Sequence, residues 1–251
     1  ESNGTLRHNG TPITGDFLAT FDALWRAASV PEQTELPFPF HGGWFVFLSY
    51  ELARFLEPTL AIMPPGNDWP VAMATRFPAA VIRDHATRTT LLVSESSNDN
   101  TLNQMEQDLR RAEGGAGDPG MPVSAAEIEE EDPALYRQRI ARILDYIRAG
   151  DTYQVNLSRA WRILLKQRAA AIDLYAQLRR TNPAPFAGLM TIDADRAIIS
   201  SSPERLASVR HGRISTRPIA GTHPRSASAE EDQALAKALV RNSKERAEHV
   251  M

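Results

Sequence analysis

Two short segments of the chain carry the side chains best suited to chemistry. Residues 202–205 read Ser-Pro-Glu-Arg and place a carboxyl group, Glu204, directly after a predicted strand. Residues 217–225 read Arg-Pro-Ile-Ala-Gly-Thr-His-Pro-Arg and place Gly221 beside the hydroxyl of Thr222. Proline stiffens the backbone on both sides of the glycine, and glycine lets a ligand approach the main chain closely. These are the parts that a site for a small polar substrate requires.

The carboxyl groups suggest an acid–base residue and a metal site, each with a plainer alternative. Glu204 is placed to project into a cleft, where a carboxyl can act as general acid or base. Its plainer interpretation is a loop-end carboxylate paired with Arg205. Glu245 and Glu248 lie i,i+3 on a predicted helix and share one face, as two oxygen ligands of Mg²⁺ would. That spacing alone decides little, because surface helices are rich in glutamate.

The composition is that of a globular chain without a general affinity for anionic partners. Its 251 residues are 42% hydrophobic, enough for a sizeable core. The 28 basic and 31 acidic side chains give a net charge of −3, which argues against nucleic acid or an anionic membrane as partner. No apolar run could span a bilayer, and residues 1–20 do not read as a signal peptide. Because there is no cysteine, we expect a reducing, cytoplasmic location.

The elements that hold these segments are predicted to be a mixture of helices and strands. Residues 16–28 have helical apolar spacing, with Asp16 as the cap. Aromatic and β-branched runs between residues 44 and 93 predict strands of one sheet. Residues 133–149 predict another helix, which ends at Gly150.

Changes in composition divide the chain into parts. We assign residues 1–95 to an N-terminal sheet subdomain and residues 96–132, which are rich in Ser, Asn, Gly and acidic residues, to a linker. Residues 133–251 form the first part of a catalytic domain. The last residues, 244–251, read as a helix without a C-terminal cap, so we expect both ends of the protein to be missing.

Alternation after Gly150 predicts a further strand. Residues 153–158 alternate apolar and polar side chains, which is the period of a strand, and Gln154 and Asn156 would point to the same side. On a sheet face open to water this pattern carries no function. If the face lines a cavity, the two amides need partners, and a polar ligand is one such partner.

Five ordered motifs resemble those of the chorismate-utilising enzymes, in particular component I of aminodeoxychorismate synthase and of anthranilate synthase. These motifs are residues 150–159, 182–185, 202–205, 217–225 and 244–249. Glu1-Ser2 is similar to the end of the family's Leu-Leu-Glu-Ser segment, and Gly42-Gly-Trp44 with residues 49–52 is similar to its N-terminal sheet. The resemblance covers nearly the whole chain.

The resemblance implies an α+β fold in which two large antiparallel sheets pack on each other with helices outside. It also implies a considerably longer enzyme, so we expect this chain to be a truncated fragment that is inactive alone. The implied reaction is amination of chorismate with ammonia from a glutamine amidotransferase subunit. Replacement of the 4-hydroxyl gives 4-amino-4-deoxychorismate, for folate and p-aminobenzoate, whereas amination at C2 with loss of pyruvate gives anthranilate, for tryptophan.

The same resemblance implies a role for individual residues. Glu204 is the implied acid–base carboxylate. The implied substrate contacts are Gln154, Ala220, Gly221 and Thr222. The implied ligands of Mg²⁺, which would bind a chorismate carboxylate, are Glu245 and Glu248. The implied effector pocket, for tryptophan, consists of Ser2, Pro185 and Phe186, with a packing role as the alternative for Pro185 and Phe186.

Few residues separate the two aminating activities. Residues 153–157 and 215–219 resemble aminodeoxychorismate synthase, but Ala220 stands where that enzyme usually carries a nucleophilic lysine, as in anthranilate synthases. Alanine forms no covalent adduct. Gln154 replaces the water-activating lysine of isochorismate-forming relatives, which favours ammonia as nucleophile. We expect direct attack by ammonia and the aminodeoxychorismate product; the alternatives are anthranilate synthase and a non-catalytic protein that binds tryptophan.

Overall fold

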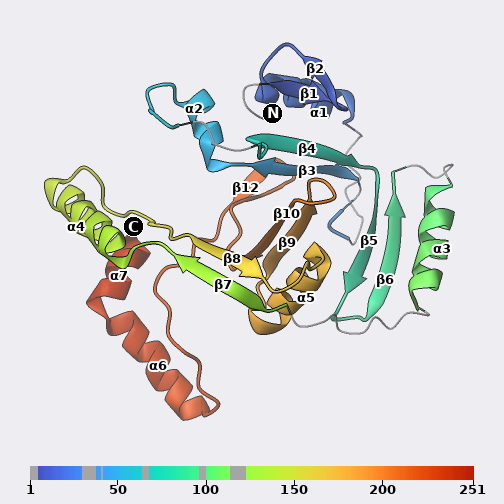
Figure 1. Ribbon diagram of the computed structural model, residues 1–251. Helices are drawn as coiled ribbons and strands as arrows, with labels where there is room; N and C mark the ends of the chain where they lie inside the picture. Colours follow the sequence, from blue (N-terminus) through green and yellow to red (C-terminus); the bar gives the residue numbers. More distant parts are fainter. Residues whose placement is uncertain (1–4, 30–37, 41, 64–67, 96–99, 114–122) are drawn as a thin grey trace. The chain divides into compact units, whose positions relative to one another are not determined.

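The computed structural model describes residues 5–29, 38–40, 42–63, 68–95, 100–113 and 123–251. The chain divides into two compact units, Glu1–Ala116 and Gly117–Met251, which are described separately below. The division lies within residues 96–132, the stretch predicted as a linker. The described strands pair antiparallel, two to a sheet, and helices occur in both units (Figure 1). The α+β class with antiparallel sheets is confirmed.

Unit 1 combines short helices with strand pairs. Its helical elements are α1 (Phe17–Ala27), the 3-10 turn η1 (Tyr50–Leu52), α2 (Ala53–Leu56) and α3 (Thr101–Glu113). Its strands are β1 (Leu6–His8), β2 (Thr11–Ile13), β3 (Gly43–Leu48), β4 (Ala72–Phe77), β5 (Ala79–Asp84) and β6 (Thr89–Ser94). Asp16 caps α1 as predicted, because its Oδ1 accepts the Ala19 N–H at 2.9 Å.

The single sheet predicted between residues 44 and 93 is wrong. β3 pairs with β4 and β5 pairs with β6, and the described residues show no ladder that joins the two pairs. Pro78 stands between β4 and β5 and has no N–H to donate to a ladder. Its carbonyl accepts the Glu95 N–H at 2.9 Å, which fixes the chain where the second pair begins.

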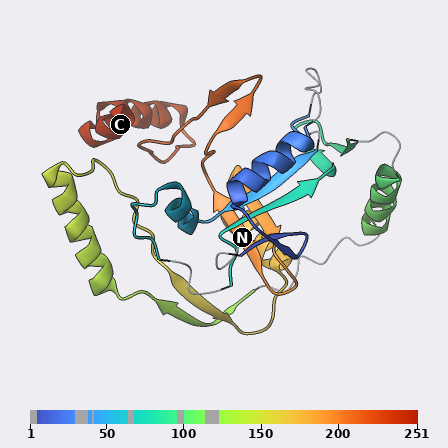
Figure 2. The ribbon, with the colours of Figure 1, turned by 90° about the horizontal axis from the view of Figure 1, so that it is seen from above.

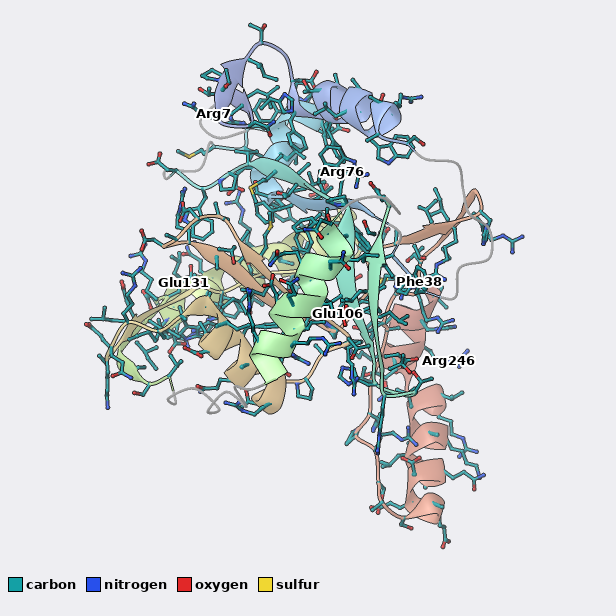
Figure 3. The ribbon with its side chains drawn as sticks, turned by 90° about the vertical axis from the view of Figure 1, so that its right-hand side faces the viewer. Arg7, Phe38, Arg76, Glu106, Glu131 and Arg246 are labelled. Atoms are coloured by element: carbon teal, nitrogen blue, oxygen red, sulfur yellow. The ribbon has the colours of Figure 1, made fainter. Side chains whose placement is uncertain are left out.

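The core of unit 1 lies where α1, η1 and the strands meet. Its buried members are Leu6, Phe17, Leu52, Val71 and Ala72, with Ile13, Phe21 and Ala74 packed against them. Phe21 of α1 contacts the Trp44 ring edge-on, with centroids 5.4 Å apart. Arg76 is labelled in Figure 3. Its guanidinium lies 5.7 Å from the centre of the Trp44 ring and pairs with Glu95. Helix and strand pair are thus joined through one aromatic side chain.

Unit 2 contains the segments that carry the predicted site. Its helices are α4 (Pro133–Ala149), α5 (Ala171–Thr181), α6 (Ala229–Arg241) and α7 (Ser243–Val250). Its strands are β7 (Ala125–Glu130), β8 (Trp161–Leu165), β9 (Phe186–Thr191), β10 (Ala197–Ser202), β11 (Ser208–Arg210) and β12 (Arg213–Ser215). The helix predicted over 133–149 is confirmed: Asp132 caps its start, and Gly150 ends it in the left-handed conformation with φ of 82°.

The strand predicted over 153–158 is wrong. Residues 151–160 have no regular structure, and β8 begins only at Trp161. The reason is the length of its partner, because β7 ends at Glu130, which is paired with Trp161, and leaves the earlier residues without a ladder. The segment is fixed instead by Arg159, whose guanidinium pairs with Glu130 and lies 4.9 Å from the centre of the Trp161 ring.

The apolar surface of unit 2 is unevenly covered. α5 packs on the β9–β10 pair (Figure 1), where Met190 is buried. On β8, by contrast, Trp161, Ile163 and Leu164 are all more than half exposed, at 51%, 56% and 62%.

Across the described part of the chain, no helix is both long enough and apolar enough to cross a lipid bilayer.

Candidate active site

The two predicted metal ligands lie on α7, a helix held in place by one asparagine. The Asn242 Oδ1 accepts the backbone N–H groups of Lys244 at 2.9 Å and Glu245 at 3.2 Å, which caps α7. The Asn242 N–H donates to the Ala238 carbonyl at 3.0 Å, so the same residue also ends α6. Figure 2 shows α6 and α7 following one another at the C-terminal end of the chain.

The carboxylates of Glu245 and Glu248 share a cation supplied by their own helix. Lys244 Nζ lies 3.3 Å from a carboxylate oxygen of each. The bond to Glu245 has the largest effect and the bond to Glu248 the next largest, and together they raise the pKa of Lys244 above its usual value. Glu245 is 14% exposed and Glu248 29%, whereas Lys244 is 69% exposed. Among the described residues no cluster of three or more His, Cys, Asp or Glu side chains exists, so any cation here would have two carboxylates.

Gly221 lies directly against Glu245. A Cβ on Gly221 would overlap the Glu245 carboxylate, and it would lie 2.8 Å from the Glu245 Cβ. The Glu245 Oε2 that fills this space is buried and has no hydrogen-bond partner. Only glycine permits this approach. The structure therefore brings the glycine of the 217–225 segment and the first carboxylate of α7 together.

Glu204 contacts the same segment. It follows β10, and its Oε1 accepts the Ile219 N–H at 3.1 Å, two residues before Gly221. Glu204 is exposed, so the described residues contact its carboxylate without enclosing it. The structure thus gathers Glu204, Gly221 and Glu245 around one stretch of backbone.

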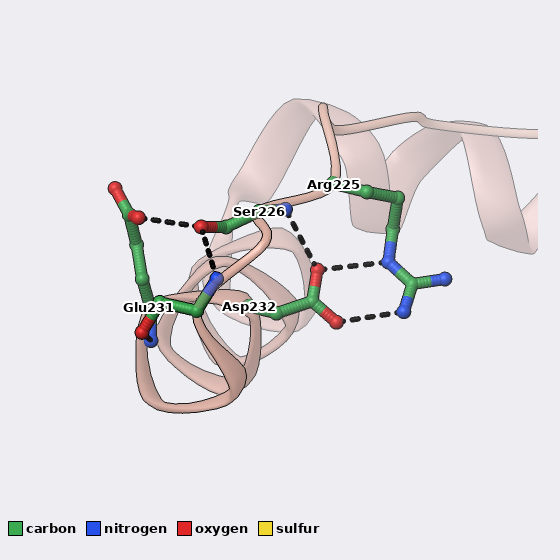
Figure 4. Close-up of polar contacts among 5 residues, drawn as sticks. Arg225, Ser226, Glu231 and Asp232 are labelled. Carbon is green, nitrogen blue, oxygen red and sulfur yellow. Dashed lines mark hydrogen bonds and ion pairs between the residues drawn. The ribbon is translucent and has the colours of Figure 1, made fainter.

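The far end of the 217–225 segment is fastened to α6 (Figure 4). Arg225 makes two parallel bonds to the Asp232 carboxylate, at 2.8 and 2.7 Å, and the same carboxylate accepts the Ser226 N–H at 3.1 Å. Both bonds lower the pKa of Asp232 below its usual 3.8, and the bond from Arg225 has the larger effect. Ser226 Oγ also donates to Glu231 at 2.5 Å. These bonds fix where the segment leaves the site.

Acidification is expected to release this fastening. The pKa of Asp232 is lower in the folded protein than its usual 3.8. The stabilisation from the ionised Asp232 carboxylate is therefore complete above pH 3.8 and is lost as the pH falls through the lower folded-state pKa. The NMR resonance of the Arg225 Nε–H group should therefore shift with a midpoint below pH 3.8, and Asp232→Asn should abolish that titration. Asp193→Asn, which removes a similarly depressed carboxylate from another turn, is the control and should leave the Arg225 resonance unchanged. A midpoint at or above 3.8 would contradict the assignment.

The chain matches a known protein family over nearly its whole length. A family model described as chorismate binding enzyme matches residues 5–251. The chain belongs to this family. The resemblance read from the five motifs is confirmed.

Named relatives carry out two related activities. The chain is 38% identical to anthranilate synthase component 1 of Streptomyces coelicolor, over 96% of this chain and 50% of that protein. It is 31% identical to aminodeoxychorismate synthase component 1 of Bacillus subtilis, over 98% of this chain and 54% of that protein. The crystal structure of anthranilate synthase component I from Streptococcus pneumoniae superimposes with a TM-score of 0.76 at 28% identity, covering 100% of this chain and 56% of that one. The chain therefore spans about half the length of these relatives.

The other predicted site residues lie at varying distances from this group. Ala220 and Thr222 flank Gly221, with Ala220 half-buried and Thr222 exposed. Gln154 lies in the irregular segment 151–160, where its carbonyl accepts the Thr152 hydroxyl at 2.9 Å. Among the described residues, no hydrogen bond joins the Gln154 side chain to Glu204 or to α7. Its role as a substrate contact remains a prediction.

The predicted effector pocket is only partly within the described residues. Ser2 lies outside them, so its place in the pocket remains a prediction. Pro185 immediately precedes β9, and Phe186 opens that strand opposite Ser202 of β10. The guanidinium of Arg205 lies 5.0 Å from the centre of the Phe186 ring. This contact joins the first residue of β9 to the Ser-Pro-Glu-Arg turn that carries Glu204.

Sequence reasoning missed two residues of the site. Lys244 received no role, although it lies four residues before Glu248, a spacing at which helical side chains pair. Asn242 was also missed. The signal was present, because asparagine just before a short polar helix is a strong capping residue.

A cavity in unit 1 is not a second candidate for this chemistry. Its volume is about 330 Å³, and its lining consists of Phe40, Trp44, Phe45, Phe77, Ala79 and Ala80. These side chains contain no titratable group, so they offer neither a proton donor nor a metal ligand. None of the predicted site residues lines it.

Proposed function

We propose that the protein is the chorismate-aminating component of an aminodeoxychorismate synthase. One observation carries the proposal: the backbone of residues 219–221 contacts both Glu204, which accepts the Ile219 N–H at 3.1 Å, and Glu245, whose carboxylate fills the space beside Gly221. An acid–base group and a candidate cation site thereby meet at one stretch of main chain. Membership of a family described as chorismate binding enzyme supports chorismate as the ligand.

Glu204 would move the protons of the reaction. Replacement of the ring hydroxyl by ammonia releases water, so the departing oxygen must gain a proton and the added ammonium must lose one. A single carboxyl can give the first proton and take the second. Its bond to the Ile219 N–H holds one oxygen, Oε1, and leaves the other, Oε2, available to the substrate.

Glu245 and Glu248 fit the Mg²⁺ that the family resemblance implies. Mg²⁺ is commonly held by one or two carboxylates and keeps several waters. The Glu245 Oε2 is a buried acceptor without a hydrogen-bond partner, and the absence of a side chain at Gly221 leaves room for this carboxylate. Bound there, the ion would supply positive charge for a carboxylate of the substrate, which a chain of net charge −3 does not supply as a whole.

Ammonia would come from a separate glutamine amidotransferase subunit, and the product would be 4-amino-4-deoxychorismate. Support for this product comes from residues 153–157 and 215–219, which resemble aminodeoxychorismate synthase. The alternative product is anthranilate, which is favoured by Ala220 and by the 38% identity to an anthranilate synthase component 1. Both reactions require the same acid–base and metal groups.

The decisive experiment is to identify the product. The full-length protein is incubated with chorismate, Mg²⁺ and ammonium, and the products are analysed by mass spectrometry, with a metal-free reaction as control. We expect a product that retains the enolpyruvyl group. Anthranilate with release of pyruvate would replace the proposed function by the alternative, and tryptophan binding without any turnover of chorismate would make the protein a ligand-binding protein.

Replacement of Ala220 tests how the nitrogen is delivered. Ala220→Lys introduces an amine beside Gly221, where the usual aminodeoxychorismate synthase carries its nucleophile. We expect a covalent adduct of the variant with chorismate, detected as a mass increase of the intact protein, whereas the wild-type protein forms none. Ala220→Met, of similar length but without an amine, is the control. An Ala220→Lys protein that turns over chorismate to anthranilate without an adduct would count against the proposal.

A further inference from the structure

The ammonium group of Lys244 lies between the two carboxylates proposed to hold Mg²⁺. Lys244 Nζ is 3.3 Å from Glu245 Oε1 and 3.3 Å from Glu248 Oε1. Glu248 follows Lys244 by four residues, the spacing at which helical side chains meet, and the flexible stem of Lys244 also lets its Nζ reach Glu245. The three charged groups sum to −1.

The two carboxylates are less exposed than the lysine that contacts them. Glu245 and Glu248 are 14% and 29% exposed, whereas Lys244 is 69% exposed. The carboxylates therefore point toward the protein, and the lysine covers them from the solvent side. Lysine is a flexible point charge, so it can leave such a position without disturbing the backbone.

Resting on the Mg²⁺ site of the proposed function, we propose that Lys244 is the resident counter-cation of this carboxylate pair. In the metal-free protein, its ammonium group neutralises part of the repulsion between Glu245 and Glu248. When a divalent cation binds, the two positive charges repel, and Lys244 moves out to solvent. The lysine weakens metal binding and keeps the two carboxylates together when no metal is present.

The repulsion between Lys244 and a bound divalent cation is large enough to measure. A divalent cation and an ammonium group about 6 Å apart repel by roughly 1.4 kcal/mol at the dielectric constant of water, which corresponds to about tenfold in affinity. Lys244→Met keeps the length of the aliphatic stem and a good helix propensity while it removes the charge. This variant should therefore bind a divalent cation about tenfold more tightly at low salt.

The test is a calorimetric titration of the full-length protein with Mn²⁺, used as a probe for the oxygen site. Lys244→Met should bind about tenfold more tightly than wild type, and Lys244→Arg, which restores the charge, should return to within about twofold of wild type. Lys237→Met, which removes an exposed lysine from α6, is the control for a change in net charge and should match wild type. Without metal, Lys244→Met should also show a lower Tm than wild type, and saturating Mn²⁺ should abolish that difference.

Two further results separate failure of this inference from failure of the metal site itself. Glu248→Gln should weaken Mn²⁺ binding strongly if the site is correct. If it does, but Lys244→Met binds as wild type does or more weakly, the role of Lys244 is wrong and the proposed site stands. If wild type binds no Mn²⁺, or Glu248→Gln binds it unchanged, both the metal site and the inference are overturned.

Discussion

Glu204→Gln is expected to lower kcat for chorismate amination by about 10²-fold or more, with KM nearly unchanged. Glutamine has the same shape as glutamate, and its carbonyl oxygen can still accept the Ile219 N–H that Glu204 accepts at 3.1 Å. The substitution therefore preserves the local structure and removes proton transfer. Steady-state kinetics with saturating Mg²⁺ and ammonium measure the effect.

Two comparisons test whether this loss reflects proton transfer. Glu230→Gln makes the same chemical change on the exposed surface of α6 and should leave kcat unchanged. A substrate-binding assay on Glu204→Gln should give an affinity close to that of wild type. If turnover by Glu204→Gln matches wild type, another group moves the proton. If the loss lies in KM alone, Glu204 binds substrate rather than catalyses.

Gly221→Ala is expected to have the second large effect. A methyl group there would overlap the Glu245 carboxylate and crowd its Cβ at 2.8 Å, so α7 or the 217–225 segment must shift. Displacement of a substrate-positioning element by about 1 Å can cost about 10²-fold in rate. We expect kcat/KM to fall by about that factor, and Mn²⁺ affinity, measured by calorimetry, to fall with it.

A second glycine provides the matched control for this variant. Gly188 lies in β9, where an added Cβ would meet nothing within 4 Å, so Gly188→Ala should retain activity and metal affinity. A double mutant gives a sharper test. If Gly221→Ala acts by displacing Glu245, it should have little further effect on Mn²⁺ affinity in a Glu245→Ala background. Additive effects would mean that Gly221 matters through contacts other than Glu245.

Local signals in the sequence predicted helices well and strand pairing poorly. Asp16 and Gly150 mark helix ends by chemistry that acts within a few residues, and both functioned as predicted. The strand predicted after Gly150 had the correct period, but a strand also needs a neighbour. β7 stops at Glu130, and no periodicity within residues 153–158 carries that information.

The candidate site could be predicted as residues but not as contacts. The motifs identified Glu204, Gly221 and Glu245 separately. That the Ile219 N–H binds Glu204 depends on how residues 205–218 fold back through β11 and β12, which spacing does not specify. That Gly221 meets Glu245 depends on where α7 begins, and hence on the cap at Asn242. Long-range geometry of this kind follows from tertiary packing rather than from local pattern.

The choice of capping residue at position 242 affects the electrostatics of the carboxylate pair. Aspartate caps helices as well as asparagine does and also interacts favourably with the positive end of the helix. It would, however, place a third negative charge within the first turn of α7, beside Glu245. Asn242 accepts the same two N–H groups with a neutral amide. The helix is thereby started without strengthening the field that any anionic substrate would have to enter.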